Sequence, residues 1–510
     1  MAEQRVVVVG AVVGGLAAAL DLAARGLAVT LLERAAVPGG KLRLLHPAGR
    51  PVDAGPTVFT LRPVFEELFA DAGARLADHL TLHPAAILAR HAWRDGSRLD
   101  LFADPRHSED AIGRFAGRAA AAGFRAFRAR AHGMWRTLEH SFVRARRPTP
   151  LTLVARAGLR GAGDLWRIAP FATLWTELGD YFADTRMRQL FGRYATYAGS
   201  SPFLAPATLM LIADVEQQGV WLVEGGMHRI AEALAGLAAA RGATLRFGAE
   251  VAAIELAGGR VAAVRLAGGE RIPAEAVVFN GDAAALSAGL LGAAVARAVP
   301  PMPATERSLS AVTFALAARA DGFPLSRHNV FFSEDYIAEF ADLRAGRLPA
   351  QPTVYICAQD RDAADGAAPD MAERLLALVN APPNGDAQEF TPAEIARCRT
   401  TMLAQLRHCG ITLRTEAELT TTPAGFARLY PATGGALYGA AVHGAMASFR
   451  RPGARTKLPG LYLAGGSTHP GAGVPMAALS GRLAAASLIA DLASTTRSRP
   501  AAMRGGISTR

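Results

Sequence analysis

The first forty residues alternate between short apolar runs and glycine-rich turns. Four consecutive valines follow Arg5 and lead to Gly10, and such a run indicates a strand buried on both faces. Residues 16–25 place leucines at helical spacing, which predicts an amphipathic helix. Residues 27–32 form a second apolar run that ends in Glu33. This order predicts a strand–helix–strand unit with a glycine turn after its first strand, the arrangement that binds dinucleotides.

The glycine turn supplies the chemistry for that binding. Gly10, Gly14 and Gly15 let a pyrophosphate approach the helix N-terminus, where free N–H groups and the helix dipole favour negative charge. Glu33 lies 23 positions after Gly10, near the spacing of about 20 expected for a carboxylate that binds ribose hydroxyls. Val12 departs from the pattern, because it replaces the middle glycine with a branched side chain. We expect FAD or NAD rather than NADP, with a purely structural turn as the alternative.

Patterns further along predict an antiparallel sheet and more helices. Residues 88–102 alternate in polarity around Asp95-Gly96, a favoured hairpin turn. Thr391 and Glu394 form a capping box that opens a helix running to Gly410. A second amphipathic helix is expected at 229–241. Strand-like runs occupy residues 244–247, 249–255, 260–266, 276–279, 308–318, 329–333 and 353–358.

Positive charge is concentrated in one segment. The chain carries a net charge of +11, and residues 111–170 hold twelve arginines against two acidic residues (12 − 2 = +10). Apolar side chains are interleaved with these arginines, at Phe115, Phe124, Phe127, Met134, Trp135 and Phe142. Such a cationic helix suits a solvated face, a membrane surface into which its aromatic residues insert, or nucleic acid. No nucleic-acid module surrounds it, so we expect residues 111–147 to dock on a membrane and expect no nucleic-acid partner.

Composition bounds the class of protein. With 510 residues and 51% hydrophobic content, the chain is expected to form two or three domains. We find no apolar run long enough to cross a bilayer, residues 283–296 being the nearest, and no secretory signal. Cys357, Cys398 and Cys409 lack CxxC spacing, which predicts reduced, buried thiols and no metal site. We expect a cytoplasmic protein that is soluble or peripheral to the inner membrane.

Several motifs resemble a known family. Residues 37–41 read VPGGK, residues 53–57 read DAGPT, and residues 458–481 read LPGLYLAGGSTHPGAGVPMAALSG. The first two resemble the flavin-dependent amine oxidase and phytoene desaturase superfamily. Together with FGRYATYAGSSP, VEGGMHRIAEAL and ASFRRPGAR, they resemble the bacterial carotenoid desaturases over nearly the whole chain. The residues of these motifs favour the hydroxyneurosporene (methoxyneurosporene) desaturase branch, which acts on 1-hydroxylated acyclic carotenoids at C3–C4.

The resemblance implies an α/β fold of three parts. These are a discontinuous Rossmann-like FAD-binding domain of the amine oxidase and phytoene desaturase type, an antiparallel-sheet substrate domain, and a helical membrane-facing subdomain. The FAD-binding parts are expected at residues 1–87, 221–290 and 441–492. The substrate and helical membrane-facing part is expected at 88–220, the substrate domain at 291–440, and a disordered tail at 493–510.

The resemblance also assigns cofactor-binding residues. They are Gly10, Val12, Gly14, Gly15, Glu33, Arg34, Gly39, Gly40, Lys41, Gly55, Pro56, Thr57, Val251, Gly465, Gly466, Gly473, Val474, Pro475 and Met476. Pro475 is expected to open a final helix whose positive end faces the flavin. Reduced flavin carries negative charge, which that helix end would stabilise.

The implied reaction removes two hydrogens from a polyene such as 1-hydroxyneurosporene. FAD takes a hydride from an allylic carbon, a neighbouring C–H becomes acidic, and quinone or oxygen serves as the electron acceptor. This chemistry needs no dedicated catalytic set. His469 is the side chain we would place near the flavin, with loop shaping as its alternative role. Alternative functions are a phytoene desaturase, a redox-silent carotene isomerase, or a flavin-free polyene binder suggested by Val12.

Overall fold

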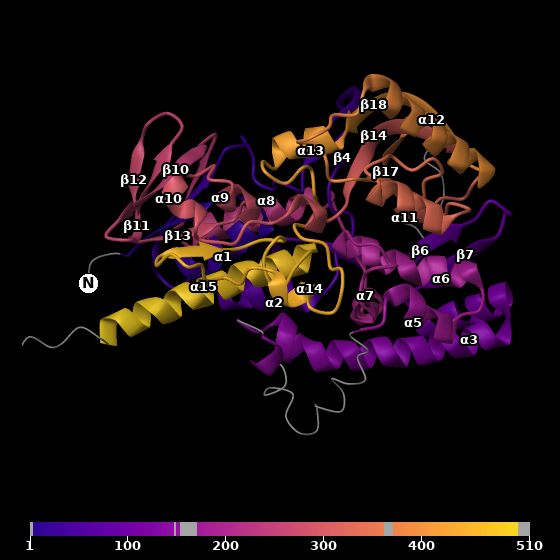
Figure 1. Ribbon diagram of the computed structural model, residues 1–510, viewed down its shortest axis with the longest axis horizontal. Helices are drawn as coiled ribbons and strands as arrows, with labels where there is room; N and C mark the ends of the chain where they lie inside the picture. The colour runs from indigo at the N-terminus through magenta and orange to yellow at the C-terminus, as the bar shows by residue number, and fades with distance from the viewer. Residues whose placement is uncertain (1–3, 147–148, 153–170, 362–370, 498–510) are drawn as a thin grey trace, which may run out of the picture.

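A parallel sheet of five strands, in the order β19-β13-β1-β2-β9, organises one half of the molecule (Figure 1). The computed structural model describes residues 4–146, 149–152, 171–361 and 371–497. The strands are β1 (Arg5–Val9), β2 (Ala28–Glu33), β9 (Thr244–Phe247), β13 (Ala276–Phe279) and β19 (Leu461–Leu463). Three stretches that are remote in sequence therefore build one sheet, and all its strands point the same way.

Helices cover one face of this sheet. Val6, Val8, Val29 and Leu31 point into a core that these helices share. The helices are α1 (Val13–Ala23), α2 (Arg62–Asp71), α8 (His228–Ala240) and α15 (Val474–Arg497). The other face packs against a small antiparallel sheet and two short helices. These are β10 (Val251–Ala257), β11 (Arg260–Leu266), β12 (Arg271–Pro273), α9 (Ala283–Ser287) and α10 (Ala293–Ala296).

A second sheet of seven strands, ordered β18-β14-β17-β16-β15-β6-β7, forms the other half (Figure 1). Its neighbouring strands are antiparallel except for the parallel pair β15–β6. The strands are β6 (Ile87–Ala92), β7 (Arg98–Phe102), β14 (Ser310–Asp321), β15 (His328–Phe331), β16 (Val354–Ala358), β17 (Glu373–Ala381) and β18 (Thr412–Thr421). The hairpin expected at 88–102 is confirmed, as is the capping box that opens α12 (Pro392–His408).

The two faces of this sheet meet different partners. α12 packs Cys398, Met402 and Leu406 against one face. A helical layer covers part of the other face. Its elements are α3 (Pro105–Leu138), α5 (Leu174–Tyr181), α6 (Thr185–Gly192), η4 (Arg193–Ala198), η5 (Ala207–Met210) and α7 (Leu211–Gln217). All three cysteines are buried, as expected.

Short elements complete the fold. The strands are β3 (Leu44–Leu45), β4 (Val52–Asp53), β5 (Leu82–Pro84) and β8 (Trp221–Val223). The helices are α11 (Tyr336–Arg344), α13 (Pro423–Leu429) and α14 (Ala447–Arg450). The short turns are η1 (Pro47–Gly49), η2 (Leu76–Asp78), η3 (Glu139–Val143) and η6 (Ala304–Glu306). β5 and β8 pair in antiparallel fashion and so join residues on either side of the helical layer.

The expected membrane insertion of the α3 aromatic residues is wrong. Phe124, Phe127 and Trp135 are 2%, 0% and 5% exposed, because they form the inner face of the helix and pack into the interior. The helix also breaks at Gly117, where φ is 86° and ψ is 171°. The amphipathic pattern identified an apolar face correctly, but that face meets protein. Residues 147–148 and 153–170 of the basic segment lie outside the described residues.

Two further predictions need correction: the lack of an apolar run long enough to cross a membrane, and the disordered tail that begins at residue 493. Residues 283–296 form two short helices, α9 and α10, whereas the final helix is long and apolar enough to span a membrane by length and composition. Its apolar window is 44% buried, and Ala478, Ala485 and Leu488 pack in the core of the parallel sheet. Residues 493–497, expected to be disordered, continue this helix because no glycine or proline interrupts them. Residues 498–510 lie outside the described part of the chain.

Candidate functional site

The carboxyl ends of the parallel strands meet along one edge of the sheet. Val9 pairs with Phe279 and with Leu32, and Phe279 pairs with Leu463. The residues that follow these strands, Gly10, Asn280 and Gly465, therefore lie side by side. Ligands of parallel α/β sheets bind at this edge, in the crevice between the loops.

Close packing explains the glycines of the opening turn. A Cβ on Gly15 would lie 2.1 Å from the carbonyl oxygen of Gly10, and one on Gly14 would lie 2.9 Å from the amide nitrogen of Gly465. Asn280 joins the two turns, since its backbone amide donates to the Val9 carbonyl at 2.8 Å and its Nδ2 donates to the carbonyl oxygen of Ala464 at 3.0 Å. The opening and closing segments of the chain thus share one cleft edge, as the sequence predicted.

The N-terminus of α1 points into this edge without a side-chain cap. Val12 is the N-cap residue, and no side chain caps the helix within the described residues. Its φ of −81° and ψ of 166° are ordinary extended values that valine adopts without strain. Its Cγ2 lies 2.4 Å from the position a Cβ on Gly40 would take. The valine side chain is therefore directed toward the Gly39-Gly40 turn, which has no side chain there.

Glu33, the last residue of β2, lies at the same edge of the sheet. Its Oε2 accepts a hydrogen bond from the Ala11 amide at 2.7 Å, and its Oε1 accepts one from Ala35 at 2.8 Å. A carboxylate offers about four acceptor positions, so two remain for ribose hydroxyls. Val251 is the first residue of β10. It lies near Glu33, because the Ala249 amide, two positions earlier, donates to the Glu33 carbonyl. Arg34 is exposed and donates instead to the carbonyl oxygen of Leu429.

The PGGK and DAGPT motifs pack directly on each other. A Cβ on Gly55 would lie 1.7 Å from the carbonyl oxygen of Lys41. Asp53 accepts hydrogen bonds from the amides of Met227, at 2.8 Å, and His228, at 3.2 Å. The Asp53 carboxylate thereby caps α8. It also joins the turn at residues 225–227, which precedes that helix, to the DAGPT motif. Thr57 is partly exposed and bonds to Tyr355 at 2.7 Å, whereas Pro56 is exposed.

The closing loop, residues 464–473 between β19 and α15, is held against α15 by hydrogen bonds. The hydroxyls of Thr468 and Ser480 are 2.7 Å apart, and Ser480 Oγ accepts the Gly465 amide at 3.1 Å. A Cβ on Gly481 would lie 2.0 Å from the Gly14 carbonyl oxygen, so α15 and α1 touch through their glycines. The other predicted residues of this loop lie around the helix start. Val474 and Pro475 are buried, Gly466 and Met476 are partly exposed, and Gly473 is exposed.

Arg451 holds the closing loop in place by donating to backbone carbonyl oxygens. Its Nη1 donates to the carbonyl oxygens of Tyr438 and Gly466, both at 2.9 Å, and its Nη2 donates to Ala440 at 2.7 Å. Burial lowers the pKa of Arg451 to about 10, so it stays charged. Burial also lowers the pKa of Lys41, and the Asp282 carboxylate partly offsets that effect. Arg451 therefore presents a fixed positive charge beside the closing loop.

His469 is buried at 4% exposure and lies beside the end of the helical layer. Its ring meets Phe142 edge-on at a centroid distance of 5.0 Å. Burial lowers its pKa to about 4, with backbone hydrogen bonds to Phe142 and Ala145 acting in the opposite direction. The imidazole is neutral near pH 7, and its Nε2 has no hydrogen-bond partner among the described residues. A catalytic role for His469 stays a prediction.

Sequence reasoning missed the polar residues that hold the site together. Asn280 Oδ1 and Asp282 Oδ2 are buried without a hydrogen-bond partner in the described ranges, and both follow β13. Their position directly after a buried strand was the available signal, because that is where ligands of parallel sheets gather. Arg451 gave no such signal, since its partners are carbonyl groups elsewhere in the chain. No cluster of metal-ligating side chains occurs in the described part.

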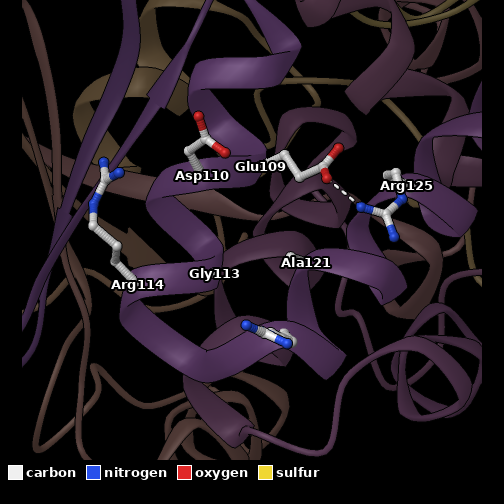
Figure 2. Close-up of a pocket in the computed structure, with 7 residues that line it drawn as sticks. Glu109, Asp110, Gly113, Arg114, Ala121 and Arg125 are labelled. Atoms are coloured by element: carbon white, nitrogen blue, oxygen red, sulfur yellow. Dashed lines mark hydrogen bonds and ion pairs between the residues drawn. The ribbon is translucent and has the colours of Figure 1, made fainter.

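A separate surface hollow lies on α3, near the Gly117 break (Figure 2). Glu109 and Arg125 pair across it, while Arg114 points away from that pair. Among the described residues its lining comes from α3 alone, so this hollow lies apart from the sheet edge that carries the glycine turns, which we call the glycine-lined edge.

This sheet edge, with its glycine turns and uncapped helix, is typical of a dinucleotide-binding protein. The chain belongs to the flavin containing amine oxidoreductase family, whose model matches residues 13–489. Its curated relatives narrow this further. It is 54% identical over 510 residues to a hydroxyneurosporene desaturase of Rubrivivax gelatinosus, covering 99% of this chain and 97% of the relative.

Other relatives agree. A hydroxyneurosporene desaturase of Cereibacter sphaeroides is 49% identical, with 97% of this chain and 99% of the relative covered. A phytoene dehydrogenase of Streptomyces griseus is 34% identical over 94% of both chains. Among solved structures, an oxidoreductase from Methanosarcina mazei gives a TM-score of 0.61 at 16% identity, covering 96% of this chain and all of the other. Cyclohexylamine oxidase from Brevibacterium oxydans gives 0.57 at 16% identity, covering 96% and 100%. The predicted α/β fold is confirmed.

The predicted cofactor, FAD, is confirmed by this membership. The residues fit it on structural grounds as well. Gly14 and Gly15 allow the opening turn to pack against Gly465 and Gly10, and the uncapped start of α1 at this edge suits a pyrophosphate. Glu33 keeps acceptor positions for a ribose, and Asn280 Oδ1 is a buried acceptor beside Gly15.

Proposed function

We propose that this protein is an FAD-dependent desaturase that removes two hydrogens, at C3–C4, from an acyclic 1-hydroxycarotenoid such as 1-hydroxyneurosporene. The observation that carries the proposal is the 54% identity, along nearly the full length of both chains, to an enzyme named hydroxyneurosporene desaturase. The glycine-lined edge supports it, because its residues fit the flavin that such an oxidation needs.

The chain's own residues bind, orient and exclude water. When bound, FAD supplies the hydride acceptor. The start of α1, together with Gly14, Gly15 and Glu33, would hold its dinucleotide part. Thr57 bonds to Tyr355 on β16 of the seven-stranded sheet, and the apolar side chains on that face, such as Val330, would pack against the polyene. A neutral His469 would accept the proton that the polyene releases.

The test is product analysis with purified holoenzyme. We expect 1-hydroxyneurosporene to give a product with one more conjugated double bond, seen as a red-shifted absorption spectrum and a mass lower by two hydrogens. Phytoene should give no such product. Conversion of phytoene with no reaction of the hydroxylated substrate would contradict the proposal and favour a phytoene desaturase.

We also propose that the protein works at the cytoplasmic surface of the inner membrane, with quinone or oxygen as its electron acceptor. Polyenes of this kind reside in lipid, so the enzyme must reach a bilayer. The support is the exposed basic face of α3, on which Arg114, Arg118 and Arg136 have no ion-pair partner among the described residues. Because the α3 aromatics are buried, attraction to anionic lipid would rest on these charges.

A further inference from the structure

A group of buried polar side chains lies where the seven-stranded sheet meets the helical layer. Val330 on β15 pairs with His91 on β6 and with Tyr355 on β16. His328 lies two positions before Val330, so the four side chains share one face of the sheet. Val330 belongs to the apolar core that the helical layer forms on this face, and Tyr355 packs against it.

The sheet side carries a hydrogen-bonded chain that starts at Thr57, one of the predicted cofactor-binding residues. Thr57 Oγ1 lies 2.7 Å from Tyr355 Oη, which lies 2.8 Å from His328 Nδ1. His328 is 2% exposed, and its Nε2 has no hydrogen-bond partner within the described ranges. Tyr355 stands on a strand flanked by β15 and β17 and is nevertheless partly exposed. Space therefore reaches this face of the sheet.

The helical side supplies a buried cation. Arg193 on η4 is 6% exposed and donates through Nη1 to Tyr197 Oη at 2.8 Å. Its Nε and Nη2 are buried and unpartnered in the described part of the chain. Tyr197 Oη donates to Glu216 at 2.9 Å, and Tyr194 bonds to the other oxygen of that carboxylate.

The charges on the two sides are balanced. Burial lowers the pKa of His328 to about 3, and the positive charges of Arg327 and Arg193 add to that effect. His328 is therefore neutral. Tyr194 and Ala195, which follow Arg193 on η4, share one apolar cluster with Val330 of β15, so Arg193 stands on an element that covers this face of the sheet. The Glu216 carboxylate offsets the arginine charge. An anionic ligand would gain little here, whereas a neutral group that both accepts and donates hydrogen bonds fits.

We propose that Arg193 and His328 bind the terminal hydroxyl group of the carotenoid and so select hydroxylated over unhydroxylated polyenes. The hydroxyl oxygen accepts from the free Arg193 N–H groups, and its proton faces His328 Nε2. The hydroxyl lies only a few bonds from C3–C4, and the chain through Tyr355 links the subsite to Thr57, a predicted cofactor-binding residue. This inference rests on the proposed function.

The experiment compares kcat/KM for 1-hydroxyneurosporene and neurosporene with purified holoenzyme. His328→Phe keeps an aromatic ring against Tyr355 but removes the free nitrogen. We expect its kcat/KM for the hydroxylated substrate to fall about 10- to 100-fold, as expected when one hydrogen bond to a substrate hydroxyl is lost. The value for neurosporene should stay within about threefold of wild type, because that substrate makes no such bond.

Two variants complete the design. His408→Phe changes an exposed histidine on α12, against the opposite face of the sheet, and should alter neither substrate. Tyr355→Phe keeps its ring and removes only the hydroxyl that holds His328, so it should lower discrimination in the same direction. It also serves if the first variant does not fold.

The outcomes separate the two proposals. Equal losses on both substrates would assign His328 a structural role and overturn the subsite. A wild-type enzyme that converts both polyenes with equal kcat/KM would also overturn it, while leaving the desaturase proposal intact. A wild-type enzyme that converts neither would instead reject the proposed function.

Discussion

Val12 shows how a single residue can depart from a motif and still suit the fold. Its backbone is extended and its side chain is directed at Gly40. We therefore expect Val12→Gly to change the Kd for FAD by less than about threefold. It should also lower the free energy of unfolding by about 1 kcal/mol, because glycine gains freedom in the unfolded chain and the packing is lost.

Flavin titration and urea unfolding of the same preparation would measure both effects. A gain in FAD affinity of about tenfold or more would show instead that the valine obstructs the pyrophosphate.

Buried histidine makes stability depend on pH. His469 has a pKa of about 4 in the fold against 6.5 in the unfolded chain, so below pH 6.5 the unfolded chain binds a proton that the native state excludes. Stability is complete above pH 6.5 and falls toward pH 4, by up to about 1.4 kcal/mol per pH unit. We expect His469→Gln to flatten this slope, measured by denaturant unfolding between pH 5 and 7.

The difference between variant and wild type is the useful readout, because other groups titrate too. His328 acts in the same direction, with a pKa of about 3. Glu339 acts oppositely, since burial raises its pKa to about 7 and its contribution is lost as pH rises. Parallel slopes for variant and wild type would show that His469 takes up its proton in the native state at its ordinary pKa.

At the scale of elements, the contact between α1 and α15 holds the two ends of the chain together. A Cβ on Gly481 would lie 2.0 Å from the Gly14 carbonyl oxygen, so Gly481→Ala must push the helices apart. We expect a loss of about 3 kcal/mol or more in unfolding free energy, with reduced flavin content. Thermal unfolding and flavin absorbance would measure these changes.

Gly236→Ala is the matched control. Gly236 lies inside α8, and a Cβ there would meet nothing within 4 Å. It should stabilise the protein by about 0.5–1 kcal/mol, because alanine loses less freedom on folding. An equal loss in both variants would argue against the steric explanation.

Elements were predictable where their patterns were strong and local. The valine run, the glycine turn and the spacing to Glu33 predicted the opening unit, and the capping box at Thr391 predicted α12. β18 was missed because polar residues dominate this edge strand. The break in α3 was also missed, since a single glycine such as Gly117 is tolerated within helices. The roles of Asn280 and Arg451 depend on distant segments, which local patterns do not reveal.

At the scale of the whole molecule, charge is the property most open to test. We expect binding to vesicles that contain anionic lipid, and weaker binding as salt rises. Reversing the unpaired charges of α3, with Arg114→Glu, Arg118→Glu and Arg136→Glu, should reduce flotation at least about tenfold, since each basic residue contributes about 1 kcal/mol.

A variant of equal net charge provides the control. Arg75→Glu, Arg260→Glu and Arg407→Glu reverse exposed arginines on other elements and should leave flotation nearly unchanged. Equal losses in both triple variants would mean that net charge, and not the α3 surface, attracts the lipid.

The arrangement of strands in the parallel sheet has a consequence for biosynthesis. β19 pairs with β13, which itself pairs with β1, so the last strand completes a sheet whose first strand lies near the start of the chain. A nascent chain on the ribosome has both opening glycine turns long before it has the loop and helix that complete them. We therefore expect flavin to bind only to a finished polypeptide, and fragments that end before β19 should emerge without colour.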